Sequence, residues 1–179
     1  MFENVRIFDG TSEKLSAPSY VLVIGNTIQT ISTAPIAAPP GTPVTRIAGG
    51  GRTLMPGLID AHTHIMFETL TQEAVLTADL AFVTVAAVKG AHDMLMRGFT
   101  SVRDVGGPVL GLKRGIDMGL VPGPRNPYPG RLGVVQEGAI ADLLLVDGDP
   151  IANIALIDDP AKNFLVIMKD GTVYKQFVR

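Results

Sequence analysis

LMPGLIDAHTHI, residues 54–65, is the stretch of the sequence that decides how the rest of it is interpreted. Its Pro-Gly pair predicts a turn, and the apolar residues that follow predict a buried strand with a polar end. Side chains at positions i and i+2 of a strand project from the same face. We therefore expect Asp60, His62 and His64 to point in the same direction from the end of this strand.

The residues after this strand predict a helix and a second strand. Residues 78–97 have apolar side chains at spacings of three and four, which is typical of a helix with one buried face. Gly98 follows as a left-handed helix stop, and residues 99–105 predict a strand. Strand, helix and strand at this spacing indicate a βαβ unit with parallel strands. The helix face that we expect to be buried comprises Leu80, Val83, Thr84, Ala87, Ala91, Met94 and Leu95.

The segments on either side of this βαβ unit contain short runs typical of β-strands. Strands are expected over residues 4–8, 20–24, 27–32, 141–146, 164–168 and 172–175. Gly25-Asn26 and Asp170-Gly171 are two-residue hairpin signals between neighbouring runs. We therefore divide the chain into residues 1–53, residues 54–125 and residues 130–179.

Two further features belong to the middle segment. Gly106-Gly107-Pro108 closes the second strand, and a second helix is expected over residues 109–118. Residues 119–129 are rich in proline and glycine, and the helical pattern does not continue into them.

Composition limits the classes of function and of metal site. The chain has 179 residues, a net charge of −2 and no cysteine. Without thiolates, a transition-metal site must use histidines and carboxylates. We find no basic stripe, signal-peptide pattern or apolar run long enough to cross a bilayer. We therefore expect a cytoplasmic protein that binds neither nucleic acid nor membrane.

His62 and His64 are the candidate metal ligands. Two neutral imidazoles that converge from the end of one strand are a plausible half of a zinc site. The alternative is that the His-x-His pattern is simply a polar strand end, which is how an isolated pattern of this kind is best interpreted. An apolar run that leads into the carboxyl end of a parallel strand favours the ligand interpretation. Asp60 either orients a metal-bound histidine or caps the strand.

The other polar candidates are weaker. His92 lies on the flank of the predicted helix and is interpreted as a surface residue. Arg103 and Asp104 end the second predicted strand, and only one of them can point inward because neighbouring side chains alternate. Asp104 contacts a substrate or orients a metal ligand, or it caps the strand through a hydrogen bond or ion pair.

These residues together resemble the metal-dependent amidohydrolase superfamily. Its PGLID-x-H-x-H signature is similar to residues 56–64, and residues 98–107 (GFTSVRDVGG) look like its second barrel strand. Residues 4–10, 138–150 and 166–174 are similar to its first strand and its C-terminal tail. Within the superfamily, the nearest subgroup is that of the Xaa-Pro and Xaa-Arg dipeptidase-like enzymes.

The resemblance implies a mixed α/β fold of two parts. A β-sandwich is built from both chain ends, and a (β/α)8 TIM barrel lies between them in the sequence. In the family the barrel holds one or two metals, usually zinc, and the first strand contributes the pair that corresponds to His62 and His64. A metal-bound hydroxide then attacks an amide or other carbonyl carbon of a small-molecule or dipeptide substrate.

The sequence departs from the family in the middle of the barrel. The family's bridging lysine, two further histidines and an aspartate have no counterpart here, and no histidine follows His92. The resemblance thus implies only the first one or two βα units of an incomplete barrel. Such a remnant leaves parallel strands uncovered, so we expect a homo-oligomer or a complementing chain as partner. An internal deletion of the barrel explains the same pattern.

Two functions remain open on the sequence alone. The first is a hydrolase of amide or other C–N bonds that uses metal-activated water. The second is a non-catalytic β-sandwich module or remnant that needs a complementary chain. Since zinc enzymes typically use three protein ligands, we expect little or no activity from the isolated chain.

Overall fold

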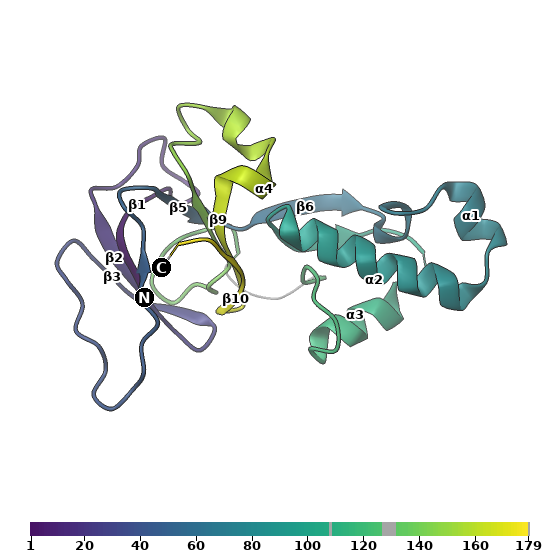
Figure 1. The fold of residues 1–179 in the computed structure, drawn as a ribbon, viewed down its shortest axis with the longest axis horizontal. Helices are drawn as coiled ribbons and strands as arrows, with labels where there is room; N and C mark the ends of the chain where they lie inside the picture. Colours follow the sequence, from purple (N-terminus) through teal and green to yellow (C-terminus); the bar gives the residue numbers. More distant parts are fainter. Residues whose placement is uncertain (108, 127–131, 179) are drawn as a thin grey trace. The chain divides into compact units, whose positions relative to one another are not determined.

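The computed structural model describes residues 1–107, 109–126 and 132–178, which form a mixed α/β fold (Figure 1). The chain divides into two compact units. Unit 1 contains both chain ends, Met1–Gly57 and Gly130–Arg179, and unit 2 is the intervening Leu58–Pro129. Pro108 and residues 127–129 of the proline- and glycine-rich stretch fall outside the described residues.

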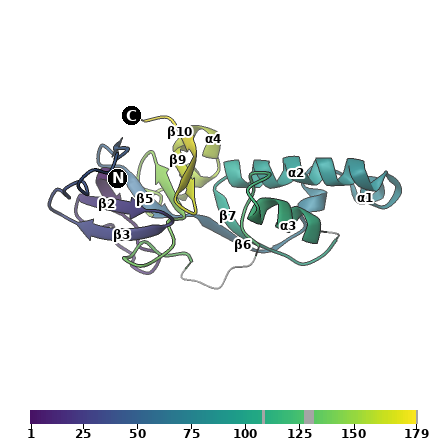
Figure 2. The same cartoon turned by 90° about the horizontal axis from the view of Figure 1, so that it is seen from below.

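Unit 1 is built on one sheet with the strand order β10-β9-β8-β5-β1-β2-β3, in which β4 also pairs with β1. Figure 2 shows the β2–β3 end of this sheet. A 3-10 helix, η2 (Ile154–Ile157), and a short helix, α4 (Pro160–Asn163), lie between β8 and β9 along the chain. The strands are β1 (Phe2–Ile7), β2 (Ser19–Ile24), β3 (Thr27–Ser32), β4 (Ile47–Ala48), β5 (Thr53–Pro56), β8 (Leu143–Val146), β9 (Phe164–Lys169) and β10 (Thr172–Gln176).

The pairing of β5 with β8 joins the two ends of the chain in this sheet. The strands are antiparallel, with Thr53 opposite Val146 and Pro56 opposite Leu143. On its other edge β5 pairs with β1 in parallel. Side chains from both chain ends therefore share one hydrophobic core, whose fully buried members include Phe2, Val21, Ile28, Leu54, Leu143, Leu145 and Val166.

Both predicted hairpins are confirmed, and their turns touch. Asp170 and Gly171 have φ values of +54° and +73°, as a turn with two left-handed residues requires. The Asn26 Nδ2 group donates a hydrogen bond to the Asp170 carboxylate over 3.0 Å. A Cβ atom on Gly171 would lie 1.9 Å from the Gly25 carbonyl oxygen. Glycine at position 171 is thus needed for its backbone conformation and for the approach of the two turns.

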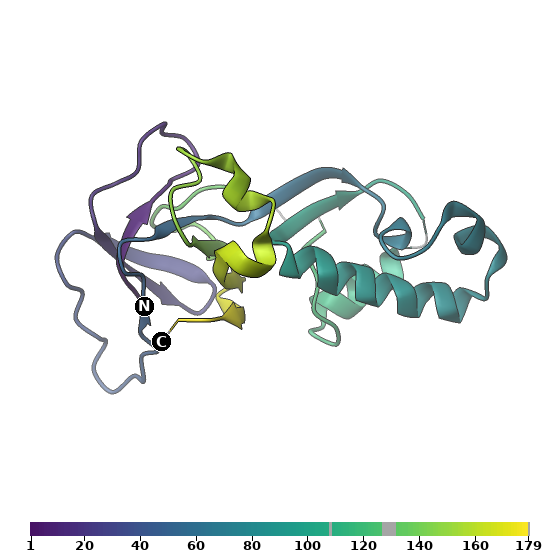
Figure 3. The same cartoon turned by 45° about the horizontal axis from the view of Figure 1, so that its top comes forward.

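Unit 2 contains the predicted strand, helix and strand. Strand β6 (Leu58–Thr63) pairs in parallel with β7 (Phe99–Asp104), and α2 (Leu80–Met96) packs against β7 (Figure 3). Asp79 caps α2 by accepting from the backbone amides of Ala81 and Phe82. Gly98 ends the helix segment with a φ of +90°. The remaining helices are η1 (Ile65–Phe67), α1 (Gln72–Thr77) and α3 (Leu110–Asp117).

Three details of the sequence interpretation are wrong. Pro56-Gly57 is not a turn, because Pro56 ends β5 and β6 begins one residue after Gly57. Strand β6 is not a buried strand, since the Ile59 side chain is 49% exposed. On α2, Leu80 and Thr84 are exposed, and the buried face is instead Val83, Ala87, Gly90, Ala91, Met94 and Leu95. Leu80 is the first residue of the helix, and nothing in the described chain covers its side chain.

Among the described residues, no helix is both long enough and apolar enough to cross a membrane.

The contact between the two hairpin turns generates a stability prediction. Gly171→Ala should lower the free energy of unfolding by at least about 3 kcal/mol, because the new methyl group adds overpacking to a strained backbone. Gly41→Ala is the matched control: its φ is +70°, but no atom lies within 4 Å of the added Cβ. This control should cost about 1–2 kcal/mol. Urea unfolding followed by circular dichroism measures both changes, and equal losses would contradict the close approach.

Candidate functional site

His62 and His64 lie together at the carboxyl end of β6. Their ring centroids are 5.6 Å apart with an interplanar angle of 73°. His62 is exposed and His64 is half-buried. The ring of Phe67 also lies beside His64, again with 5.6 Å between centroids. The structure therefore brings the two predicted ligands together on the strand end.

A β-bulge changes how β6 presents the residues before them. Asp60 pairs with Val102 and Thr63 with Asp104, so three steps along β6 correspond to two along β7. The simple alternation that places Asp60 on the same face as His62 does not apply across this bulge. Instead, the Asp60 carboxylate accepts a hydrogen bond from the His62 backbone amide over 3.0 Å. Two roles are open for Asp60, and this hydrogen bond is the contact that a cap on the local backbone makes.

Asp104 holds together the ends of the two parallel strands. Its Oδ2 accepts from the backbone amide of Ile65 over 2.9 Å, and its Oδ1 accepts from the amide of Gly106 over 3.1 Å. The first bond fixes the residue directly after His64, and the second fixes the loop after β7. The contacts of Asp104 are thus those of a strand cap. Arg103 is exposed, and its Nε donates to the carbonyl of Ala61 over 2.8 Å.

Gly106 contributes to the placement of His64 and was not identified as a site residue from the sequence. A Cβ at position 106 would lie 3.2 Å from Cε1 and 3.3 Å from Nδ1 of the His64 ring. Any larger residue would therefore crowd the imidazole. The Gly-Gly pair directly after a predicted strand was the available signal, because backbone that approaches a functional side chain closely favours glycine.

Among the described contacts, His92 touches neither His62 nor His64. Its side chain is 47% exposed on α2, and its Nδ1 lies 3.5 Å from Oδ1 of Asp93. A hydrogen bond from Lys89 is the main cause that lowers the pKa of Asp93 below its usual value. The prediction that His92 is a surface residue is confirmed.

The histidine pair fits part of a metal site. Zn–N bonds of 2.0–2.1 Å put a ring centre roughly 3.2 Å from the metal, so two rings on one tetrahedral ion lie about 5 Å apart. The observed separation is close to this value, although ordinary T-shaped ring packing has the same range. Within the described ranges, no group of three or more histidine, aspartate or glutamate side chains is close enough to hold an ion. His62 and His64 thus fit two ligand positions of a site that needs a third.

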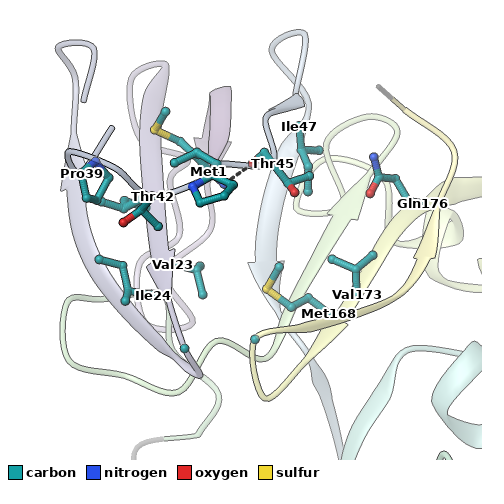
Figure 4. A pocket seen from close by; sticks show the side chains of 15 residues that line it. Met1, Val23, Ile24, Pro39, Thr42, Thr45, Ile47, Met168, Val173 and Gln176 are labelled. Carbon is teal, nitrogen blue, oxygen red and sulfur yellow. Dashed lines mark hydrogen bonds between the residues drawn. The ribbon is translucent and has the colours of Figure 1, made fainter. Parts of the chain in front are cut away.

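A pocket in unit 1 offers different chemistry. It has a volume of about 560 Å³ and is lined by side chains that include Val23, Ile24, Ile47, Met168 and Val173 (Figure 4). Its polar lining is limited to threonine, glutamine and backbone groups together with the Met1 amine. No lining side chain in this described pocket is a carboxylate or an imidazole. The described lining of this pocket therefore offers none of the carboxylates or imidazoles that hold a metal in a protein without cysteine.

Comparisons with known proteins give a family and a fold. Residues 53–130 match the model of the Amidohydrolase family. A solved amidohydrolase is 35% identical, with a TM-score of 0.64 over 70% of this chain and 30% of its own. A prolidase in complex with N-methylphosphonate-L-proline is 30% identical, with a TM-score of 0.63 and the same coverage of both chains. The chain thus spans about 30% of the length of these two proteins.

One further structure matches the whole chain. An uncharacterized protein superposes with a TM-score of 0.87 over 98% of this chain and 99% of its own, at 14% identity. At that identity the match shows the fold alone. A search of curated proteins gave no significant match.

The contacts of Asp104 predict a local loss of structure when it is replaced. Asp104→Ala leaves the amides of Ile65 and Gly106 without their acceptor, which costs about 1–3 kcal/mol of local stability. Hydrogen exchange at these two amides should therefore become at least about ten-fold faster. Asp117→Ala on α3 is the control, because that carboxylate is exposed and pairs only with Lys113 among the described contacts. Unchanged exchange at Ile65 would contradict the capping role.

Proposed function

Residues 53–130 belong to the amidohydrolase family, and from this premise we propose that the chain is part of a metal-dependent hydrolase that cleaves amide or other C–N bonds. The observation that carries the proposal is the placement of His62 and His64 at the carboxyl end of a parallel strand, with rings 5.6 Å apart. Active sites of parallel α/β folds lie at this end of the strands.

The two imidazoles are the groups that would hold one or two divalent metals, with zinc as the favoured ion. Such a metal, when bound, polarises a carbonyl group and lowers the pKa of water. The chain's own contribution is to orient the ligands. Asp104 fixes the backbone after His64, Gly106 leaves room for the His64 ring, and Asp60 binds the amide of His62. These contacts preserve the geometry of the pair without a metal.

The substrate class follows from the proteins that this chain resembles. The prolidase structure holds a phosphonate compound of proline. We therefore favour a dipeptide or a similar small amide as the substrate.

The architecture proposed for this function has two parts. The mixed sheet of residues 1–57 and 130–179 corresponds to a composite β-sandwich, and a core shared by both chain ends supports this assignment. The parallel β6–β7 pair with α2 and α3 corresponds to the first βα units of an incomplete TIM barrel. The greater length of the matched proteins supports an incomplete barrel.

The second candidate is a non-catalytic module, and the incomplete ligand set favours it for the isolated chain. Asp60 within β6 and Asp104 at the end of β7 both accept hydrogen bonds from backbone amides. In the described residues, no third ligand accompanies the histidines. The chain alone is thus expected to bind metal weakly and to turn over no substrate.

Metal analysis and a dipeptide assay test this function. The isolated chain, dialysed against micromolar zinc, should retain less than one ion per polypeptide and should not hydrolyse Xaa-Pro dipeptides. Replacing both His62 and His64 by alanine should remove the retained zinc, since they are the two ligands. His92→Ala should retain the same zinc as the parent chain, because His92 lies on the exposed face of α2. Equal zinc in all three proteins would contradict the ligand assignment, and turnover by the isolated chain would contradict its incompleteness.

A further inference from the structure

Helix α2 is apolar on more than one side. Between Leu80 and Val88, Thr84 is the one polar residue. Val83 and Ala87 are buried in unit 2, yet Phe82 and Val85 are 55% and 69% exposed. A helix at the surface of a protein normally has a polar outer face, whereas one that is apolar all round is covered on both sides. The first half of α2 therefore has exposed apolar side chains on a side that a helix of this composition normally buries.

Strand β6 lacks a neighbour on one edge. In the described part of the chain it pairs with β7 alone, and the sheet they form has two strands. The side chain of Ile59 in this strand is 49% exposed. Parallel strands are normally buried on both faces, and an open edge presents unpaired backbone groups that favour the addition of a strand. Strand β6 thus presents both an apolar side chain and an open edge.

The other edge of the sheet shows how the pairing continues. Arg125 forms a parallel bridge with Ser101 of β7. Its amide donates to the carbonyl of Thr100, and its carbonyl accepts from the amide of Val102, each over 2.8 Å. A third parallel strand therefore begins beside β7, and Arg125 is the residue of it that pairs with β7. Every pairing in unit 2 is parallel, so the open edge of β6 fits a strand from the same kind of βα unit.

We propose that the open edge of β6 and the exposed apolar side chains of α2 form a docking surface for a second, different polypeptide that supplies further βα units. This inference rests on the proposed function. The partner adds a parallel strand beside Ile59 and a helix against Phe82 and Val85. It also brings a histidine or carboxylate to the carboxyl end of β6, beside His62 and His64.

The comparisons favour this partner over a second copy of the chain. Seventy per cent of this chain corresponds to only 30% of the matched amidohydrolase, so that protein is more than twice as long. Two copies would still not reach that length. A second copy would also supply only the same three histidines and the same β6 edge.

The test is complementation with a defined probe. The full chain is co-expressed with the segment of the 35% identical amidohydrolase that this chain does not match. We expect a one-to-one complex by light scattering and at least about ten-fold slower hydrogen exchange at residues 58–63 than in the chain alone. Zinc should rise from less than one ion to at least one ion per complex.

A matched pair of variants locates the surface. Ile59→Lys should reduce the amount of co-purified fragment at least about ten-fold, because it places an unpaired charge in the interface. Ile24→Lys is the control, since Ile24 is also 49% exposed in a strand but lies in unit 1. It should leave the complex unchanged within about two-fold.

The outcomes separate this inference from the proposed function. Absence of a complex, equal loss in both variants, or a self-associated chain already protected at residues 58–63 would overturn the docking surface. A complex that forms as expected but binds no zinc would uphold the docking surface and contradict the metal-dependent function. Full zinc binding by the chain alone would support that function and overturn the need for a partner.

Discussion

The antiparallel pairing of β5 with β8 is the constraint on which the rest of the structure depends. These two short strands are far apart in the sequence, and all of their residues are buried. Their backbone hydrogen bonds place Leu54 and Leu145 in a core that also contains Phe2 and Val166. The chain leaves this sheet at Gly57 and returns to it beyond residue 131. Unit 2 is therefore an insertion between the two parts of unit 1 in the sequence. Unit 2 can therefore vary in length without disturbing the sheet that both chain ends build.

Local chemistry explains why much of the fold could be predicted. The Asp170-Gly171 turn, the Gly98 stop and the period of α2 are each decided by a few neighbouring residues. The exceptions depend on residues that are distant in sequence. Strand β5 was not predicted, because its partner β8 lies about ninety residues later. Strand β6 has the apolar sequence of a buried strand, yet Ile59 is exposed because burial requires neighbours that the described chain does not place there.

The candidate site was predictable in identity but not in geometry. His-x-His after an apolar run identified the two residues whose rings lie together. The bulge between Asp60 and Thr63 could not be predicted from alternation, since it is a property of the register with β7. Within this bulge, the Asp60 carboxylate accepts a hydrogen bond from the His62 amide. Asp104 accepts hydrogen bonds from two backbone amides, one with each carboxylate oxygen. A carboxylate engaged in this way positions a ligand and is poorly placed to carry a proton to a substrate.

The open edge of β6 and the incomplete ligand set have one physical cause. Parallel strands end at a common edge of a sheet, so each added strand brings its polar terminal residues towards the same point. The end of β6 alone brings His62 and His64 together, but the β6–β7 pair does not enclose them: His62 remains exposed. Water then competes for any bound ion, and a substrate carbonyl would meet bulk solvent in place of a low-dielectric pocket. A strand added beside Ile59 would thus also complete the proposed metal site, because hydrogen bonding along the strand and ligand convergence at its end require the same neighbour.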